Sequence, residues 1–167
     1  MPIHYREGTT ADLDALQKLG LIAYGQFQSV LTEGNWQQLA SFLTASENYS
    51  ALLSTSTCFV AEQNDALIGM AFLVPSGNPT DIFQADWSYV RMVGVHPAHG
   101  GKGIGKQLML NCIEHARSHE ETTVALHTSE FMDTARYMYE KMGFVQVKAI
   151  EPRYGKKYWL YLLPLVP

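Results

Sequence analysis

Hydrophobic residues recur along the first third of the chain with a strand period and then with a helix period. Residues 3–7 predict a short first strand. A capping segment at residues 10–12 precedes apolar residues at helical spacing (Leu13, Leu16, Leu19 and Ile22), so a helix is expected to start near residue 10. The same period returns from Glu33 to about Ser54 and predicts a second helix.

Two β-prone apolar runs follow, and their spacing is typical of a hairpin. Residues 57–62 and 66–74 are joined by the short polar segment 63–65, so the two strands should pair antiparallel. Residues 75–85 are rich in Ser, Gly, Asn, Pro and Asp and predict a loop. A further strand is expected over residues 87–95.

The remainder of the chain alternates between helical and extended patterns. It predicts a helix over about 103–119, a strand over 122–127, a helix over 131–142, and strands over 144–150 and 158–163. The strand–helix–strand unit around residues 103–119 requires one parallel strand pair with a right-handed crossover. We therefore expect an α/β fold of the α+β type in a single domain, residues 1–167. Its mixed, mostly antiparallel sheet has six to seven strands and is flanked by about four helices.

Composition excludes several classes of protein. The 167 residues are 47% hydrophobic, enough for one substantial core. The 12 basic and 16 acidic residues give a net charge of −4 without any basic run, so a nucleic-acid partner is not expected. No apolar run is long enough to span a membrane and no signal peptide is apparent. With two cysteines, the sequence predicts a cytoplasmic protein with reduced thiols.

Residues 95–106, Val-His-Pro-Ala-His-Gly-Gly-Lys-Gly-Ile-Gly-Lys, form the most informative segment. A strand leads through a glycine-rich turn into a helix, and such a helix start offers free N–H groups and a positive dipole end to an anion. The spacing of Gly101, Gly103 and Gly105 differs from both the dinucleotide-binding fingerprint and the P-loop. The segment therefore predicts a phosphorylated ligand that is neither a dinucleotide nor an ordinary nucleoside triphosphate.

The turn resembles motif A of the GCN5-related N-acetyltransferases (GNAT), which wraps the pyrophosphate of coenzyme A. A second resemblance lies in residues 135–144, which are similar to motif B of that family, a helix ending in Tyr-x-x-x-Gly-Phe. The resemblance covers nearly the whole chain. It implies the GNAT fold, acetyl-CoA as cosubstrate, and transfer to a primary amine in a ternary complex. The cosubstrate-binding residues it implies are Met92, Val93, Val95, Gly100, Gly101, Lys102, Gly103, Ile104, Gly105, Lys106 and Tyr139.

The resemblance also implies how the thioester is held and cleaved. Val93 would polarise the thioester carbonyl through its backbone N–H, and the strand edge at residues 92–95 would pair with the pantetheine amides. Tyr139 matches the family's motif tyrosine and would protonate the departing thiolate, a role suited to a side chain that is neutral at pH 7. The alternative is a helix tyrosine that merely packs.

Three positions depart from the family pattern. Gly100 stands where Gln or Arg is usual, Met132 replaces an Asn, and Tyr89 replaces the Glu that many members carry as general base. Tyr89 could relay a proton through water, and Asp86, Glu130 and His127 are further candidates for the base. Each also has a structural interpretation, as loop end, helix cap or core histidine.

Neither a metal nor a cysteine intermediate is expected. His115 and His119 have metal-ligand spacing on one helix, but no third ligand is evident and a solvated face is favoured. Cys58 and Cys112 stand among apolar neighbours and are interpreted as buried structural thiols.

The acceptor is open: a small-molecule amine, a peptide N-terminus or a protein lysine. Its pocket walls are expected from residues 33–36, 75–86 and 151–157, and acids at Glu33, Asp81 and Asp86 suggest a cationic amine or polyamine. A non-catalytic acyl-CoA-binding sensor is the competing class, and a nucleotide-binding protein is a third. The apolar run 158–163 could complete the sheet or form a homodimer contact.

Overall fold

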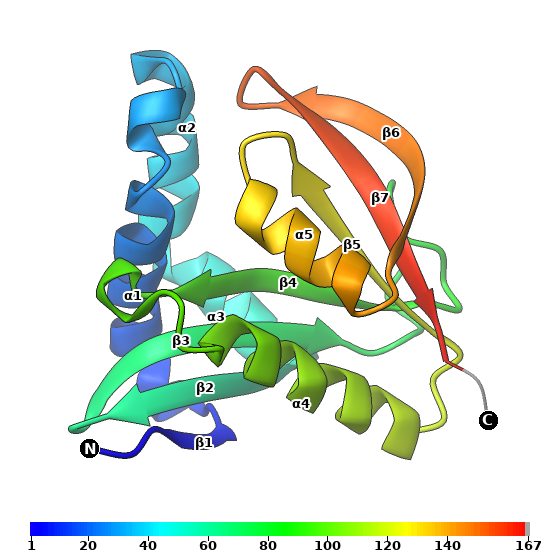
Figure 1. Cartoon of the computed structure of the whole chain (residues 1–167), viewed down its shortest axis with the longest axis horizontal. Helices are drawn as coiled ribbons and strands as arrows, with labels where there is room; N and C mark the ends of the chain where they lie inside the picture. The colour runs from blue at the N-terminus through cyan, green and yellow to red at the C-terminus, as the bar shows by residue number, and fades with distance from the viewer. Residues whose placement is uncertain (166–167) are drawn as a thin grey trace.

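The computed structural model describes residues 1–165. Seven strands form one sheet in the order β1-β2-β3-β4-β5-β7-β6 (Figure 1). The strands are β1 His4–Glu7, β2 Thr57–Gln63, β3 Ala66–Val74, β4 Ser88–Val95, β5 Thr123–Ser129, β6 Val145–Arg153 and β7 Lys156–Pro164. β4 and β5 pair parallel, whereas the other neighbouring strands pair antiparallel. The predicted mixed, mostly antiparallel sheet is therefore confirmed.

Helices cover both faces of the sheet. They are α1 Leu13–Gly25, α2 Glu33–Thr44, α3 Ser46–Thr55, α4 Ile104–Ser118 and α5 Asp133–Lys141. In Figure 1 α4 and α5 lie in front of the sheet, and both contribute to one buried cluster through Leu108 and Tyr139. A second cluster on the other face contains Leu16 of α1 and Leu52 of α3. No helix within residues 1–165 is both long and apolar enough to cross a bilayer.

The helix expected over 33–54 is two helices, so that prediction was wrong in part. Ala45 is extended, with φ −82° and ψ 108°, and separates α2 from α3. Side chains of α3 satisfy the carbonyls that the end of α2 leaves free: Asn48 donates to Phe42 O at 2.9 Å and the Tyr49 hydroxyl donates to Leu43 O at 2.9 Å. The periodicity continued across the break because both helices turn their apolar side toward the protein interior.

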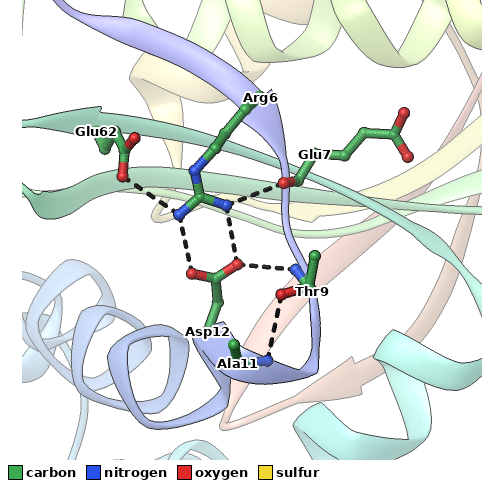
Figure 2. A network of polar contacts seen from close by, with 6 residues as sticks. All are labelled: Arg6, Glu7, Thr9, Ala11, Asp12 and Glu62. Atoms are coloured by element: carbon green, nitrogen blue, oxygen red, sulfur yellow. Dashed lines mark hydrogen bonds and ion pairs between the residues drawn. The ribbon is translucent and has the colours of Figure 1, made fainter.

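β1 is attached to the rest of the sheet by a polar network around Arg6 (Figure 2). Its guanidinium donates twice to the Asp12 carboxylate at 2.9 Å and once to Glu62 of β2 at 3.2 Å. Asp12 also accepts from the Thr9 backbone N–H at 2.8 Å, which completes a capping box just before α1. These contacts hold the pKa of Asp12 below its usual range, chiefly through the hydrogen bonds from Arg6.

Two features of the sheet bear on function. β4 and β5 pair only through Ser88 with Val124 and Tyr89 with Ala125, and beyond these pairs the two strands separate. β7 pairs with β5 on one side and β6 on the other. The apolar run 158–163 therefore completes the sheet, as one of its two predicted roles, and it is paired along both sides.

Candidate active site

A pocket of about 700 Å³ opens where β4 and β5 separate. Residues Val90 to Val95 of β4 and Leu126 to Thr128 of β5 form two of its walls. The start of α4 lies at one end, and α1, α2 and the β6–β7 turn lie at the other. The volume is in the range of cavities that bind small molecules and cofactors.

The start of α4 is built to approach an anion. Gly101 and Gly103 have φ of +77° and +76°, a conformation that side chains other than glycine rarely adopt. Gly103 is the N-cap and no side chain among residues 1–165 caps the helix, so the first N–H groups of α4 remain available. Gly100, Gly101, Gly103, Ile104, Gly105 and Lys106 all line the pocket.

Lys102, also expected there, does not line the pocket. Its ammonium group lies 3.2 Å from Nδ1 of His99, which does line the pocket. Lys106, one helical turn further on, does reach the pocket wall. The positively charged side chain at this end is therefore Lys106.

A bulge in β4 turns its backbone toward the pocket. Met70 pairs with Gly94 and Phe72 with Arg91, so that two residues, Met92 and Val93, stand opposite one residue of β3. Met92 has a φ of +53°. The hydroxyl of Tyr24 in α1 lies 3.3 Å from the carbonyl oxygen of Val93 and donates to it. Tyr24, which the sequence analysis did not single out, thus contacts the bulge directly.

Tyr139 occupies the pocket wall formed by α5. It is 5% exposed, and burial raises the pKa of its hydroxyl above the ordinary tyrosine value. Within residues 1–165 no group forms a hydrogen bond with that hydroxyl. Tyr139 is therefore a neutral hydroxyl that faces the pocket and remains free to bond a ligand.

Only one of the four candidates for a general base lines the pocket. Tyr89 stacks on Phe83 and does not line the pocket, and its hydroxyl donates to Asn78 O at 3.1 Å. Asp86 is exposed and outside the pocket, and Glu130 accepts from the Lys157 N–H at 2.6 Å. His127 lines the pocket, and its buried Nδ1 has no hydrogen-bond partner within the described part of the chain. Burial lowers the pKa of His127 to about 3, so the imidazole is neutral at pH 7.

The far end of the pocket is aromatic and basic. Its apolar wall consists of Tyr24, Phe27, Leu39, Phe42, Leu43, Phe131, Tyr154 and Tyr158, and two arginines, Arg91 and Arg153, accompany it. Of the three segments expected to form these walls, 151–157 does so through Arg153 and Tyr154, whereas 33–36 and 75–86 do not. The acids Glu33, Asp81 and Asp86 are likewise absent from it.

Arg91 could have been found from sequence, because it is a charged residue inside the apolar strand 87–95. Arg153 and Tyr154 belong to the segment 151–157, which the sequence analysis expected as a pocket wall without singling out either residue. Met132, which stands where the family has Asn, lines the pocket and its sulfur lies 3.6 Å from the Thr128 hydroxyl. A thioether sulfur that accepts from the Thr128 hydroxyl thus stands where the family has an amide.

The remaining candidate groups lie elsewhere. His115 and His119 stack at 4.1 Å on α4, and across residues 1–165 no three His, Cys, Asp or Glu side chains gather in a way that could hold a metal. Cys58 and Cys112 are buried, and burial raises the pKa of each thiol to about 12. Both thiols are therefore protonated and poor nucleophiles at pH 7.

Comparison with known proteins decides the family. Residues 23–144 match the Acetyltransferase (GNAT) family. The chain belongs to this family. It is thus an N-acetyltransferase of the class that depends on acetyl-CoA. A curated relative, the uncharacterized N-acetyltransferase YdgE of Bacillus subtilis (strain 168), is 25% identical over 119 residues, 68% of this chain and 74% of the relative.

Solved structures of the GNAT type share the fold. The PaiA N-acetyltransferase of Thermoplasma acidophilum, in complex with coenzyme A, is 16% identical, with a TM-score of 0.74 over 96% of this chain and 98% of that one. YncA of Salmonella typhimurium, with acetyl-CoA, is 20% identical, with a TM-score of 0.70 over 98% and 94%. The predicted GNAT fold is confirmed.

Proposed function

We propose that this GNAT enzyme binds acetyl-CoA in the pocket between β4 and β5 and passes the acetyl group directly to a primary amine. The observation that carries the proposal is the pocket itself, which joins an uncapped glycine-rich helix start, a strand bulge and a free tyrosine hydroxyl. Two structural neighbours were solved with coenzyme A or acetyl-CoA, which supports the same ligand here.

The chain supplies separate groups for the two ends of the cosubstrate. The N–H groups at the start of α4, with Lys106, bind the pyrophosphate, and the edge of β4 next to the bulge binds the pantetheine amides. The N–H of Val93 donates to the thioester oxygen, where negative charge develops during attack. Holding the thioester and amine together in one pocket also lowers the entropic part of the barrier.

Tyr139 acts on the leaving group. As the amine nitrogen bonds to the acetyl carbon, the carbon–sulfur bond breaks and the thiolate takes the hydroxyl proton of Tyr139. The amine nitrogen loses one proton to water, and water returns one proton to the tyrosinate. The raised pKa of Tyr139 keeps its hydroxyl protonated at pH 7. Neither buried cysteine takes part, so transfer needs no acyl-enzyme.

The test compares Tyr139→Phe with Tyr137→Phe, a matched change on the same helix at a side chain that is 64% exposed. We expect Tyr139→Phe to lower kcat by about 100-fold or more, as loss of a general acid does, with acetyl-CoA affinity within twofold of wild type. Tyr137→Phe should change neither. The measurements are thiol release with a panel of amines and isothermal titration with coenzyme A.

An equal loss of kcat and affinity in Tyr139→Phe would show that the tyrosine is structural and would contradict the assigned role. Coenzyme A binding without transfer to any amine would instead favour the acyl-CoA sensor. Its motivation is the presence of Gly100, Met132 and Tyr89 where the family usually has polar functional residues.

A further inference from the structure

We infer that the acceptor is a small amine that carries a carboxylate and an apolar, preferably aromatic, body, and that Arg91 and Arg153 bind the carboxylate. The inference rests on the proposed function, because it assigns the far end of the same pocket to the acceptor. It replaces the expectation of a cationic amine or polyamine, whose acids do not line that pocket.

The charge balance at this end points to an anion. Arg91 comes from β4 and Arg153 from the end of β6, and neither forms an ion pair with any residue in 1–165. The carboxylate in the pocket wall, Asp133, is engaged by Arg136. Two arginines without a carboxylate partner would repel a polyamine and attract an acid, which guanidinium groups bind through two parallel hydrogen bonds.

The two arginines act on one shared region of the pocket, although they are far apart in sequence. Each lowers the pKa of His127 and each lowers the pKa of Tyr154, and both of those side chains line the pocket. Arg91 also lies two residues from Val93 on the same strand, on the other side of the bulge residue Met92. A carboxylate between the arginines therefore lies within small-molecule reach of the acetyl group bound at Val93.

The apolar wall gives the acceptor its second feature. Phe27 and Phe131 make an edge-to-face contact at 5.1 Å, and Phe131 and Tyr158 make another at 6.3 Å, so the wall is a connected set of rings. Such a wall favours an aromatic body over a second charged group.

The β6–β7 turn limits how large the acceptor can be. Its two central residues, Tyr154 and Gly155, both have positive φ, of +53° and +71°. The turn lies directly against α2, since a Cβ at Gly155 would come within 2.6 Å of the Asn35 amide nitrogen. This contact closes one side of the acceptor end, which suits a free small molecule better than an extended peptide or a lysine on a protein surface.

The experiment uses acceptors that differ only in the acid. Acetyl transfer is measured with phenylalanine, with 4-(2-aminoethyl)benzoate and with phenethylamine, so that the carboxylate is near the amine, far from it, or absent. We expect kcat/KM for the better of the two acids to exceed that of phenethylamine by roughly 10-fold or more, the range of a charge-assisted hydrogen bond.

Variants then assign the preference to residues. Arg91→Gln and Arg153→Gln should each reduce the ratio of kcat/KM for the acid to kcat/KM for phenethylamine about tenfold. Arg117→Gln, at an exposed arginine of α4 outside the pocket, is the matched control and should have no effect. A second readout needs no turnover: with coenzyme A present, N-acetylphenylalanine or 4-(2-acetamidoethyl)benzoate should stabilise the wild type against heat, and N-acetylphenethylamine should not.

Equal kcat/KM values for the acids and for phenethylamine would overturn the inference. So would an equal loss of kcat/KM for the acids and for phenethylamine in the arginine variants, or no acetyl transfer to either acid. Those outcomes leave the proposed function standing if coenzyme A binds and another amine is acetylated. Absence of coenzyme A binding would overturn both.

Discussion

At the scale of single residues, burial decides which ionisable groups in the pocket are neutral. His127 and Tyr139 both line it, and burial lowers the pKa of the histidine and raises that of the tyrosine. Each therefore stays uncharged at pH 7, as a possible hydrogen-bond acceptor and a proton donor respectively. Tyr24, whose pKa burial raises to about 12, is similarly neutral where it contacts the bulge.

His127 makes stability depend on pH. Its pKa is about 3 in the folded chain and about 6.5 when unfolded, so between these values the unfolded chain binds more protons and stability falls as pH falls. From pH 6.5 to 4 this group alone costs wild type about 3 kcal/mol. His127→Phe should remove that part of the acid destabilisation.

Urea unfolding at pH 7 and pH 4 would measure the effect. His4→Phe, at an exposed histidine of β1, serves as the control and should retain the wild-type pH dependence. If His127→Phe lost stability on acidification as steeply as wild type, the imidazole would not be held neutral by burial.

At the scale of elements, the strand–turn–helix unit from β4 to α4 carries most of the predicted site, and local rules explain why. Glycine is needed where φ is positive, as at Gly101 and Gly103, and such positions can be guessed from glycine spacing. The bulge at Met92 could not be predicted in this way, because nothing in the sequence marks a methionine that has a positive φ. It arises from a register shift that pairing with β3 imposes.

Neighbouring glycines of this turn should respond differently to alanine. Gly103→Ala forces a Cβ into left-handed backbone and should cost about 1–2 kcal/mol of stability and weaken coenzyme A binding about tenfold. Gly100→Ala is the control, since Gly100 has a φ of −63° and its nearest neighbour would lie at 3.5 Å. Calorimetric titration measures the coenzyme A affinity of each variant, and urea unfolding measures its stability. Equal effects of the two substitutions would show that the positive φ is not what requires glycine at position 103.

At the scale of the whole molecule, the two halves of the sheet meet through the short pairing of β4 with β5. A ligand held by α4 on one side and α5 on the other contacts both halves and binds only the folded chain. Coenzyme A at 100 times its Kd should therefore add about 2.7 kcal/mol and raise Tm by roughly 5–10 °C.

ATP and NAD at the same concentration are the comparison ligands in that scanning measurement. A similar shift with either would favour the nucleotide-binding interpretation. A shift with coenzyme A and acetyl-CoA alone would agree with the glycine spacing of the α4 turn, which matches neither nucleotide motif.

The sequence by itself determined the order of elements, the single parallel crossover, the glycine turn and the position of Tyr139, because each follows from local periodicity or from residue types at short spacing. Tertiary structure decided the rest. It broke the helix at Ala45, packed Tyr89 against Phe83 outside the pocket, and left His127 as the one base candidate in the pocket. It also brought Arg91 and Arg153 to one region, since only the pairing of distant strands determines which residues share a cavity.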